Sequence, residues 1–147
     1  MRRIITGRDA DGRSCVVNEV ELGPAEGPIH VTSVFRTDSP PPSRPQGRGA
    51  FRDLGVAPGR TQWVISRWAP NEEAATHHTD TVDFDLVVEG SIEIMLDDGS
   101  HHLVAGDCVV VTGVDHAWKA GPGGCTLSVV LLGTPPPDGV ANRTGAP

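Results

Sequence analysis

Residues 77–90 read HHTDTVDFDLVVEG, which places imidazole, hydroxyl and carboxylate groups directly before an apolar run. Side chains of a strand alternate between its two faces, so an unbroken strand would put His77, Thr79 and Asp83 on one face. An imidazole and a carboxylate on one face can share a metal ion. The alternative interpretation is a polar loop that leads into a strand.

A second imidazole lies in residues 105–120, AGDCVVVTGVDHAWKA, where a Gly-Asp turn begins a very apolar strand and His116 opens the next one. Two histidines and a carboxylate leave coordination positions open for water or substrate, as in catalytic zinc and non-haem iron sites. We therefore predict that His77, Asp83 and His116 bind one divalent metal ion. Zinc, iron, nickel and manganese all suit these ligands. The alternative is a barrel whose polar residues only hydrogen-bond one another.

Neighbouring residues are candidates for catalytic roles. A neutral hydroxyl binds metal poorly, so we expect Thr79 to orient a bound water or a substrate oxygen. Asp85 has the parity of Asp83, and desolvation would raise its pKa and suit it as a general acid or base, unless it is a salt-bridged carboxylate at the rim. His78 and Asp80 are candidates for a fourth ligand, although the parity of His78 predicts that it faces solvent.

Aromatic and cationic side chains are candidates for substrate binding. Trp118 lies two residues after His116 and therefore on the same face, where it would stack on a flat substrate or pack in the core. Trp63 is a second candidate, and it lies on the opposite face from Trp68 because five residues separate them. Arg67 would pair with a substrate carboxylate or oxyanion, or be an ordinary surface cation.

The elements that must position these residues are short strands. From Thr61 to Gly133, strand-like runs follow one another with short connections and without helical periodicity, which predicts an all-β antiparallel barrel or sandwich. The runs cover residues 61–69, 83–90, 91–98, 100–107, 108–113, 116–120 and 125–133. The sequence DDGS between two of them predicts a hairpin turn.

The remaining segments are expected to be peripheral. Residues 2–7, 14–22 and 29–37 are β-branched runs typical of outer strands. Residues 38–49 are rich in proline and glycine, which indicates an exposed connector or a lid. The tail, residues 133–147, is too polar to bury much apolar surface, and we expect it to be mobile or to lie on the surface.

Composition restricts the class of protein. A chain of 147 residues is most simply one domain, 1–147, with outer strands and the connector in 1–60, the barrel in 61–132 and a tail. A net charge of -7 without a basic cluster excludes nucleic acid as the main partner. No apolar run is long enough to span a membrane, and three scattered cysteines indicate reduced thiols in a soluble cytoplasmic protein.

The two motifs together resemble those of the cupin superfamily, small β-barrels with a metal site. The first family motif, H-x-H, then E, then G, aligns with His77, Thr79, Asp83 and Gly90, and the second aligns with 106–116. The chain departs from the family where Thr79 replaces a histidine and Asp83 replaces a glutamate. It is similar to a cupin subgroup with H-x-T-D-T-x-D and G-x-x-H-A-W motifs, present here as HHTDTVD and GVDHAW.

This resemblance implies a cupin-type antiparallel β-barrel, also called a double-stranded β-helix or jelly roll, over about half of the chain. It implies a metal-dependent enzyme that acts on a small organic acid or polyketide-like molecule through lyase, dehydratase or isomerase chemistry. The alternatives are an Fe(II)-dependent dioxygenase and a ligand-binding barrel without catalysis. The resemblance also implies a homodimer, in which the apolar runs before Arg36 would be exchanged.

Overall fold

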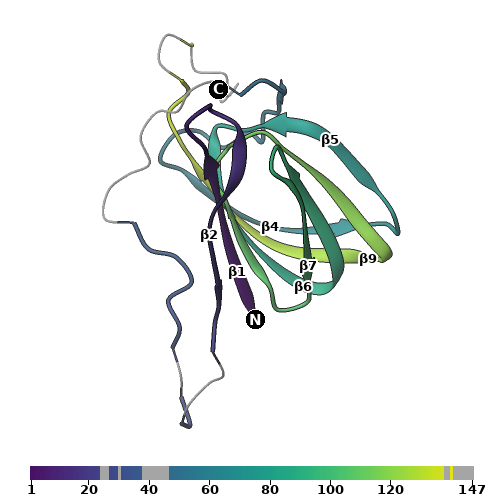
Figure 1. Cartoon of the computed structure of the whole chain (residues 1–147). Helices are drawn as coiled ribbons and strands as arrows, with labels where there is room; N and C mark the ends of the chain where they lie inside the picture. Colours follow the sequence, from purple (N-terminus) through teal and green to yellow (C-terminus); the bar gives the residue numbers. More distant parts are fainter. Residues whose placement is uncertain (24–26, 30, 38–46, 138–139, 141–147) are drawn as a thin grey trace.

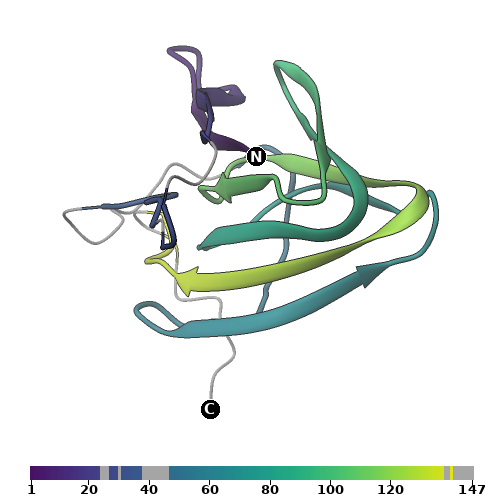
Figure 2. The ribbon, with the colours of Figure 1, turned by 90° about the horizontal axis from the view of Figure 1, so that it is seen from below.

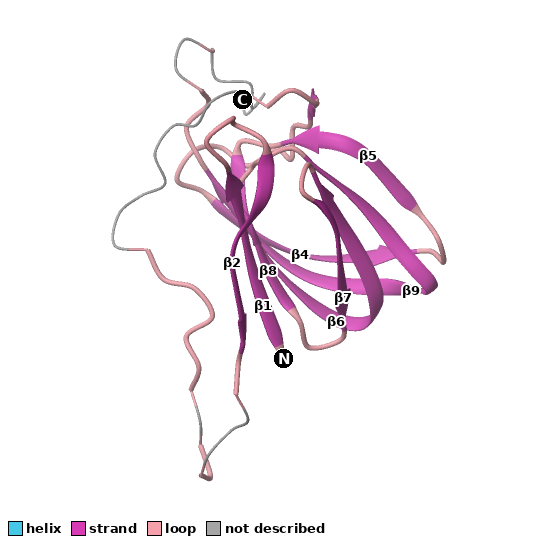
Figure 3. Ribbon diagram, viewed as in Figure 1, coloured by secondary structure: helices cyan, strands magenta, loops and turns pink. Residues whose placement is uncertain are grey.

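The computed structural model describes residues 1–23, 27–29, 31–37, 47–137 and 140. These residues are all β, without a helix, and their strands form one curled sheet that makes a half-barrel (Figures 1 and 3). The all-β fold class predicted from the sequence is therefore confirmed. The strands are β1 (Arg2–Arg8), β2 (Ser14–Glu21), β3 (Ala50–Phe51), β4 (Thr61–Trp68), β5 (Glu73–His78), β6 (Thr81–Leu96), β7 (Gly99–Val104), β8 (Cys108–Val111) and β9 (His116–Gly133).

The order of strands along the sheet is β2-β1-β8-β6-β9-β5-β3, with β4 paired to β9 and β7 paired to β6. The pairs β1–β8 and β3–β5 are parallel, and the other described pairs are antiparallel. The predicted hairpin is confirmed, because Leu96 pairs with Gly99 across a turn of Asp97 and Asp98. The described part of the chain contains no helix that could span a membrane.

The N-terminal strands are less peripheral than the sequence indicates. β1 lies inside the sheet between β2 and β8, and its Ile4 is fully buried. The prediction of a strand over 29–37 is wrong, because the described residues 31–37 pair with no strand. Side chains hold this segment instead: the ring of Phe35 lies 5.5 Å from that of Phe84, and Arg3 donates a hydrogen bond to the carbonyl of Val34.

Two long strands replace four of the predicted short ones. β6 runs through residues 83–90 and 91–98 of the prediction, and β9 joins 116–120 to 125–133. Gly90 and Gly124 have φ values of 75° and 77°, and the β6–β9 register shifts beside Gly90. Each strand therefore bends at a glycine and continues instead of ending there. The view in Figure 2 shows β6 and β9 bending round together, which curls the sheet.

Gly90→Ala should destabilise the fold by about 3 kcal/mol or more, because a left-handed φ is combined with a steric clash. A Cβ at Gly90 would meet the carbonyl oxygen of Gly124. Gly12 is the matched control, since its φ is 77° and a Cβ there meets nothing within 4 Å. Gly12→Ala should cost only about 1 kcal/mol. Equal losses in urea unfolding would show that the close approach of the two strands contributes nothing.

Two predicted segments lie partly outside the described residues. Of the Pro-rich stretch 38–49, residues 47–49 are described, and of the tail 133–147, residues 133–137 and 140 are described. The described start of the tail is packed: Thr134 is buried, and its N–H donates to the carbonyl of Asp80 at 2.9 Å.

Candidate functional site

A cavity of about 160 Å³ lies on the inner face of the half-barrel. Five of the predicted site residues line it, namely His77, Asp83, Asp85, His116 and Trp118. They come from β5, β6 and β9, with β4 and the segment after β3 completing the wall. The sequence therefore identified residues that the fold brings to one place from positions up to 41 residues apart, the separation of His77 and Trp118.

His77 and His116 form a matched pair. They are directly opposite each other in the β5–β9 register, and their ring centroids lie 4.4 Å apart. Nδ1 of His77 lies 2.8 Å from the carbonyl oxygen of Ala75, and Nδ1 of His116 lies 2.8 Å from that of Val114. Because a carbonyl only accepts, both Nδ1 atoms carry the proton, and in the neutral rings both Nε2 atoms keep a lone pair.

Both imidazoles are held neutral. Burial lowers the pKa of His77, and the charge of Arg52 lowers it further. Burial, followed by the charge of the His77 ring, lowers the pKa of His116 from 6.5 to about 4. The site therefore presents two electron-pair donors near neutral pH. This is the form in which histidine binds a metal ion, and a backbone carbonyl on the other ring nitrogen is a common support for such a ligand.

His116 should make the stability of metal-free protein depend on pH. Its folded-state pKa of about 4 lies below the 6.5 of an unpaired histidine, so only the unfolded chain takes up a proton between these values. Stability should therefore fall as pH decreases from 6.5 towards 4, by about 3 kcal/mol from this group. Urea unfolding of chelator-treated protein would measure the slope. His116→Gln should flatten the slope relative to the exposed control His102→Gln, and equal slopes would contradict the assignment.

Two carboxyl groups share the cavity with the histidines. Asp83 and Asp85 are 7% and 6% exposed and lie two residues apart on β6, so both point inward. Burial raises the pKa of Asp85 well above its ordinary value, and the neighbouring Asp83 carboxylate raises it further. Oδ2 of Asp85 has no hydrogen-bond partner in the described structure. Asp85 thus holds a proton more readily than an ordinary carboxyl group does, which suits it to exchange a proton with a bound molecule.

The donor set fits a metal ion only in part. The two Nε2 lone pairs suit zinc, iron, nickel or manganese. Among the described residues, however, no three His, Cys, Asp or Glu side chains come close enough together to hold one ion. Asp83 lines the same cavity without joining the histidines as the predicted third ligand. The protein thus provides two ligands, and solvent or substrate oxygens would have to complete a coordination shell.

The strand that was expected to run unbroken from His77 to Asp83 is interrupted. β5 ends at His78 and β6 begins at Thr81. Thr79 is therefore not on the cavity wall; it is buried, and its Oγ1 accepts a hydrogen bond of 2.9 Å from Oγ1 of Thr81. Its hydroxyl is used within the turn, so the predicted role in orienting substrate has no geometric support.

The prediction that His78 faces solvent is wrong, because it is 2% exposed. The β5–β9 register is irregular between Ala74 and His77, so simple alternation fails there. The ring of His78 contacts Phe51 at a centroid distance of 5.7 Å, and its Nδ1 lies 3.6 Å from the Asp115 carboxylate. The other suggested fourth ligand, Asp80, lies beside a separate small pocket near Phe51.

Trp63 and Arg67 lie outside the cavity. Val64, Ser66 and Trp68 of β4 line it, so alternation turns the odd-numbered side chains to the outer face. Trp63 is accordingly 73% exposed, and its indole N–H donates to Ser128. Trp68 lines the cavity, whereas Trp63, the predicted substrate-binding residue, does not. Trp118 is placed as predicted and meets the His116 ring edge-on at 5.8 Å.

Arg52 and Asp115 are site residues that the sequence analysis missed. Arg52 is largely exposed and lines the cavity, so it puts a cation at the cavity mouth in place of Arg67. The buried Asp115 carboxylate accepts backbone N–H bonds of 2.8 and 2.9 Å from Arg48 and Gly49. It thereby fastens the chain before β3 next to His116. Arg52 and Asp115 both reach the site through residues that are distant in the sequence. The sequence offered one local indication of a role, namely that Asp115 directly precedes the predicted ligand His116.

Comparison with known proteins gives partial matches. No family model matches the chain. The phomopsin biosynthesis cluster proteins C' and D of Diaporthe leptostromiformis are 35% identical to it over 63 residues, which is 42% of this chain and 33% of theirs. The oryzines biosynthesis cluster protein J of Aspergillus oryzae is 39% identical over 51 residues, 34% of this chain and 28% of its own. The chain thus matches about a third of the length of these relatives.

Solved cupin structures are similar over half of the chain. A sugar phosphate isomerase from the cupin superfamily of Silicibacter pomeroyi has a TM-score of 0.45 and 25% identity, over 51% of this chain and 52% of its own. A cupin superfamily protein from Desulfitobacterium hafniense has a TM-score of 0.46 and 23% identity, over 50% and 67%. Three residues of the two sequence motifs, His77, Asp83 and His116, line the inner cavity of the curled, all-β half-barrel.

Proposed function

We propose that this protein is a metal-dependent enzyme that acts on a small organic acid by moving a proton, with lyase, dehydratase or isomerase chemistry. The observation that carries the proposal is the pair His77 and His116, two imidazoles with fixed tautomers in one cavity with the buried acid Asp85, whose pKa is raised. His77 and His116 would hold the metal. When bound, the ion would polarise a carbonyl or stabilise an enolate.

The other wall residues would bind and orient the substrate. The guanidinium of Arg52 at the mouth suits a substrate carboxylate. The faces of Trp68 and Trp118 form apolar walls, and the buried indole N–H of Trp68 has no partner in the described structure, so it can donate to a substrate oxygen. Asp85 would deliver or accept the proton. A volume of about 160 Å³ restricts the reacting part of the substrate to a small group.

The partial relatives favour a role in secondary metabolism. Those proteins take their names from the phomopsin and oryzines biosynthesis clusters. Because the chain matches about a third of each relative, this proposal takes from them a setting in biosynthesis and not a whole activity. We place this protein in the modification of a small biosynthetic acid.

Proton transfer next to a carbonyl can be tested without knowing the natural substrate. We would incubate a panel of small 2-oxo and 3-oxo acids with metal-loaded protein in D2O and follow loss of the C–H signal by NMR. Wild-type protein should exchange at least one acid, and Asp85→Asn should slow the exchange by about 100-fold or more. Arg67→Gln, on the outer face, should exchange at the wild-type rate. Exchange that is equally fast in Asp85→Asn would overturn the assignment of Asp85.

We further propose that the protein is a homodimer. Trp63, Ile65 and Val88 are 73%, 48% and 52% exposed on the outer face of β4 and β6, on either side of β9. Ile29 and Val31 are 85% and 87% exposed among the described residues that follow β2. In a dimer, the exposed apolar sheet face of one protomer would pack against the exposed apolar segment of its partner.

Trp63→Glu should therefore shift the protein from dimer to monomer. Sedimentation equilibrium should give twice 15.5 kDa for the wild type and 15.5 kDa for the variant. Arg60→Gln, an exposed polar change that removes no apolar side chain, should remain a dimer. A wild-type protein that is monomeric at all concentrations would end this proposal without touching the enzymatic one.

A further inference from the structure

A second and larger cavity, of about 560 Å³, lies against β6 and β8 and is covered by residues 33–37. Phe84 and Leu86 line it, and these residues alternate with Asp83 and therefore point to the other face of β6 from the histidine pair. The site is thus distinct from the inner cavity. Its size falls within the range of about 300–1,000 Å³ that is typical of small-molecule sites.

The walls of this outer cavity are apolar and fixed in place. Val110 and Cys108 are only 1% and 7% exposed although they lie on β8 at the outer side of the sheet, because the segment 33–37 covers them. The Phe35–Phe84 ring contact at 5.5 Å and the 2.8 Å hydrogen bond from Arg3 to the carbonyl of Val34 hold that segment down. The cavity is therefore formed before any ligand arrives.

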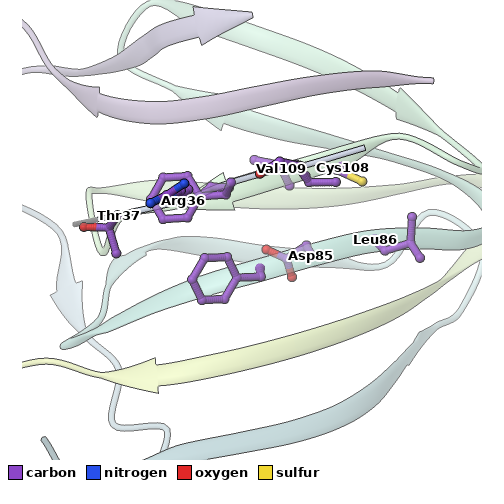
Figure 4. A pocket seen from close by; sticks show the side chains of 11 residues that line it. Arg36, Thr37, Asp85, Leu86, Cys108 and Val109 are labelled. Carbon is purple, nitrogen blue, oxygen red and sulfur yellow. The ribbon is translucent and has the colours of Figure 1, made fainter. Parts of the chain in front are cut away.

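Polar groups occupy defined positions in the outer cavity. Figure 4 shows Arg36 and Thr37 at one end, Leu86 and Cys108 at the other, and Asp85 between them. Among the described lining residues, Arg36 carries the only positive charge. Asp85 is 6% exposed, and its Oδ2 has no hydrogen-bond partner in the described structure. The carboxyl group of Asp85 points to the inner face of β6, so Arg36 is the charged group that this cavity offers to a ligand.

We propose that the outer cavity is a binding site for an amphipathic carboxylic acid with an aromatic or similarly bulky apolar body. The carboxylate pairs with Arg36, whose planar guanidinium matches it. The apolar body lies against Phe35 and Phe84 and extends towards Leu86. The site requires neither His77 nor His116, so it goes beyond the function proposed for the inner cavity. Asp85 is among the lining residues of both cavities.

The test uses 2-naphthoic acid as the probe and its neutral analogue 2-naphthalenemethanol, with binding followed by isothermal titration calorimetry. Arg36→Gln should weaken naphthoate about tenfold or more and leave the alcohol unchanged, because one charged hydrogen-bonded contact is lost. Ser33→Trp, at an exposed lining position, should block both probes. Arg60→Gln should change neither. Both altered residues are exposed, so the variants should fold.

Inner and outer binding can be separated. Arg52→Gln and the double variant His77→Ala/His116→Ala should keep wild-type affinity for naphthoate, even where they abolish metal or substrate binding in the inner cavity. The proposal is overturned if naphthoate does not bind, or if Arg36→Gln binds it as wild type does. It is also overturned if Ser33→Trp converts a dimer to a monomer, because the cavity would then be the seat of a second copy.

Discussion

Replacing His77 and His116 together by alanine should remove tight binding of divalent metal ions. The two Nε2 atoms are the only pair of neutral imidazole donors that the described cavity wall presents, and their tautomers are fixed by the carbonyls of Ala75 and Val114. Changes to residues that merely support a ligand weaken metal binding by about 10–100-fold, so loss of two ligands should exceed about 100-fold. Calorimetric titration of untagged, chelator-treated protein with Zn²⁺ or Ni²⁺ would measure this loss.

The control for this experiment is a histidine pair of the same chain outside the cavity. His101 and His102 lie on the β6–β7 hairpin, and His101 is paired with Asp98 at 2.8 Å. His101→Ala/His102→Ala should bind metal as tightly as wild type. If the hairpin variant loses the affinity and the cavity variant keeps it, the cavity is not a metal site. If neither wild type nor variants bind metal, His77 and His116 would have to act as acid–base groups alone.

The pairing of His77 with His116 could be predicted, because each lies beside a recognisable turn: His77 is next to the end of β5, and His116 opens β9. The third ligand could not. The parity argument for Asp83 assumed a continuous strand, yet β5 ends at His78 and β6 starts at Thr81. Alternation along a strand is a local rule. It correctly predicted that Asp83 points inward from β6, but it could not predict the distance from Asp83 to the imidazoles. Coordination depends on that distance, and only the tertiary structure gives it.

The all-β fold class could be predicted, because strand-like runs and turn residues are local features of the sequence. The number of strands could not be predicted. Gly90 and Gly124 read as strand ends in the sequence, since glycine relaxes φ. In the fold they allow two neighbouring strands to bend at one place and continue. For Trp63 and Trp68, one part of the prediction could be made from the sequence and the other could not. The opposite faces of the two residues followed from spacing alone, but which face was inner depended on the curl of the sheet.

Asp85→Val should make the protein more stable, by about 2 kcal/mol, while abolishing proton transfer. A buried polar group without a hydrogen bond costs roughly 2–7 kcal/mol relative to water, and replacing it with an apolar group of similar shape removes that cost. One oxygen of Asp85 is such a group, since burial and the Asp83 carboxylate raise the pKa of Asp85 and its Oδ2 has no partner in the described structure. Urea unfolding at neutral pH would measure the gain.

Asp107 provides the matched control, because it is 7% exposed but both of its carboxylate oxygens accept hydrogen bonds. One of its carboxylate oxygens accepts the N–H of Arg2 at 2.8 Å, and the other accepts that of Val104 at 3.1 Å. Asp107→Val should therefore destabilise the protein by about 2 kcal/mol or more, since two donors lose their acceptor. Opposite signs for these two substitutions would mean that Asp85 is kept at the expense of stability, as expected of a functional group. A loss of stability in Asp85→Val as large as in Asp107→Val would instead make Asp85 a structural residue, and it would remove the acid from the proposed mechanism.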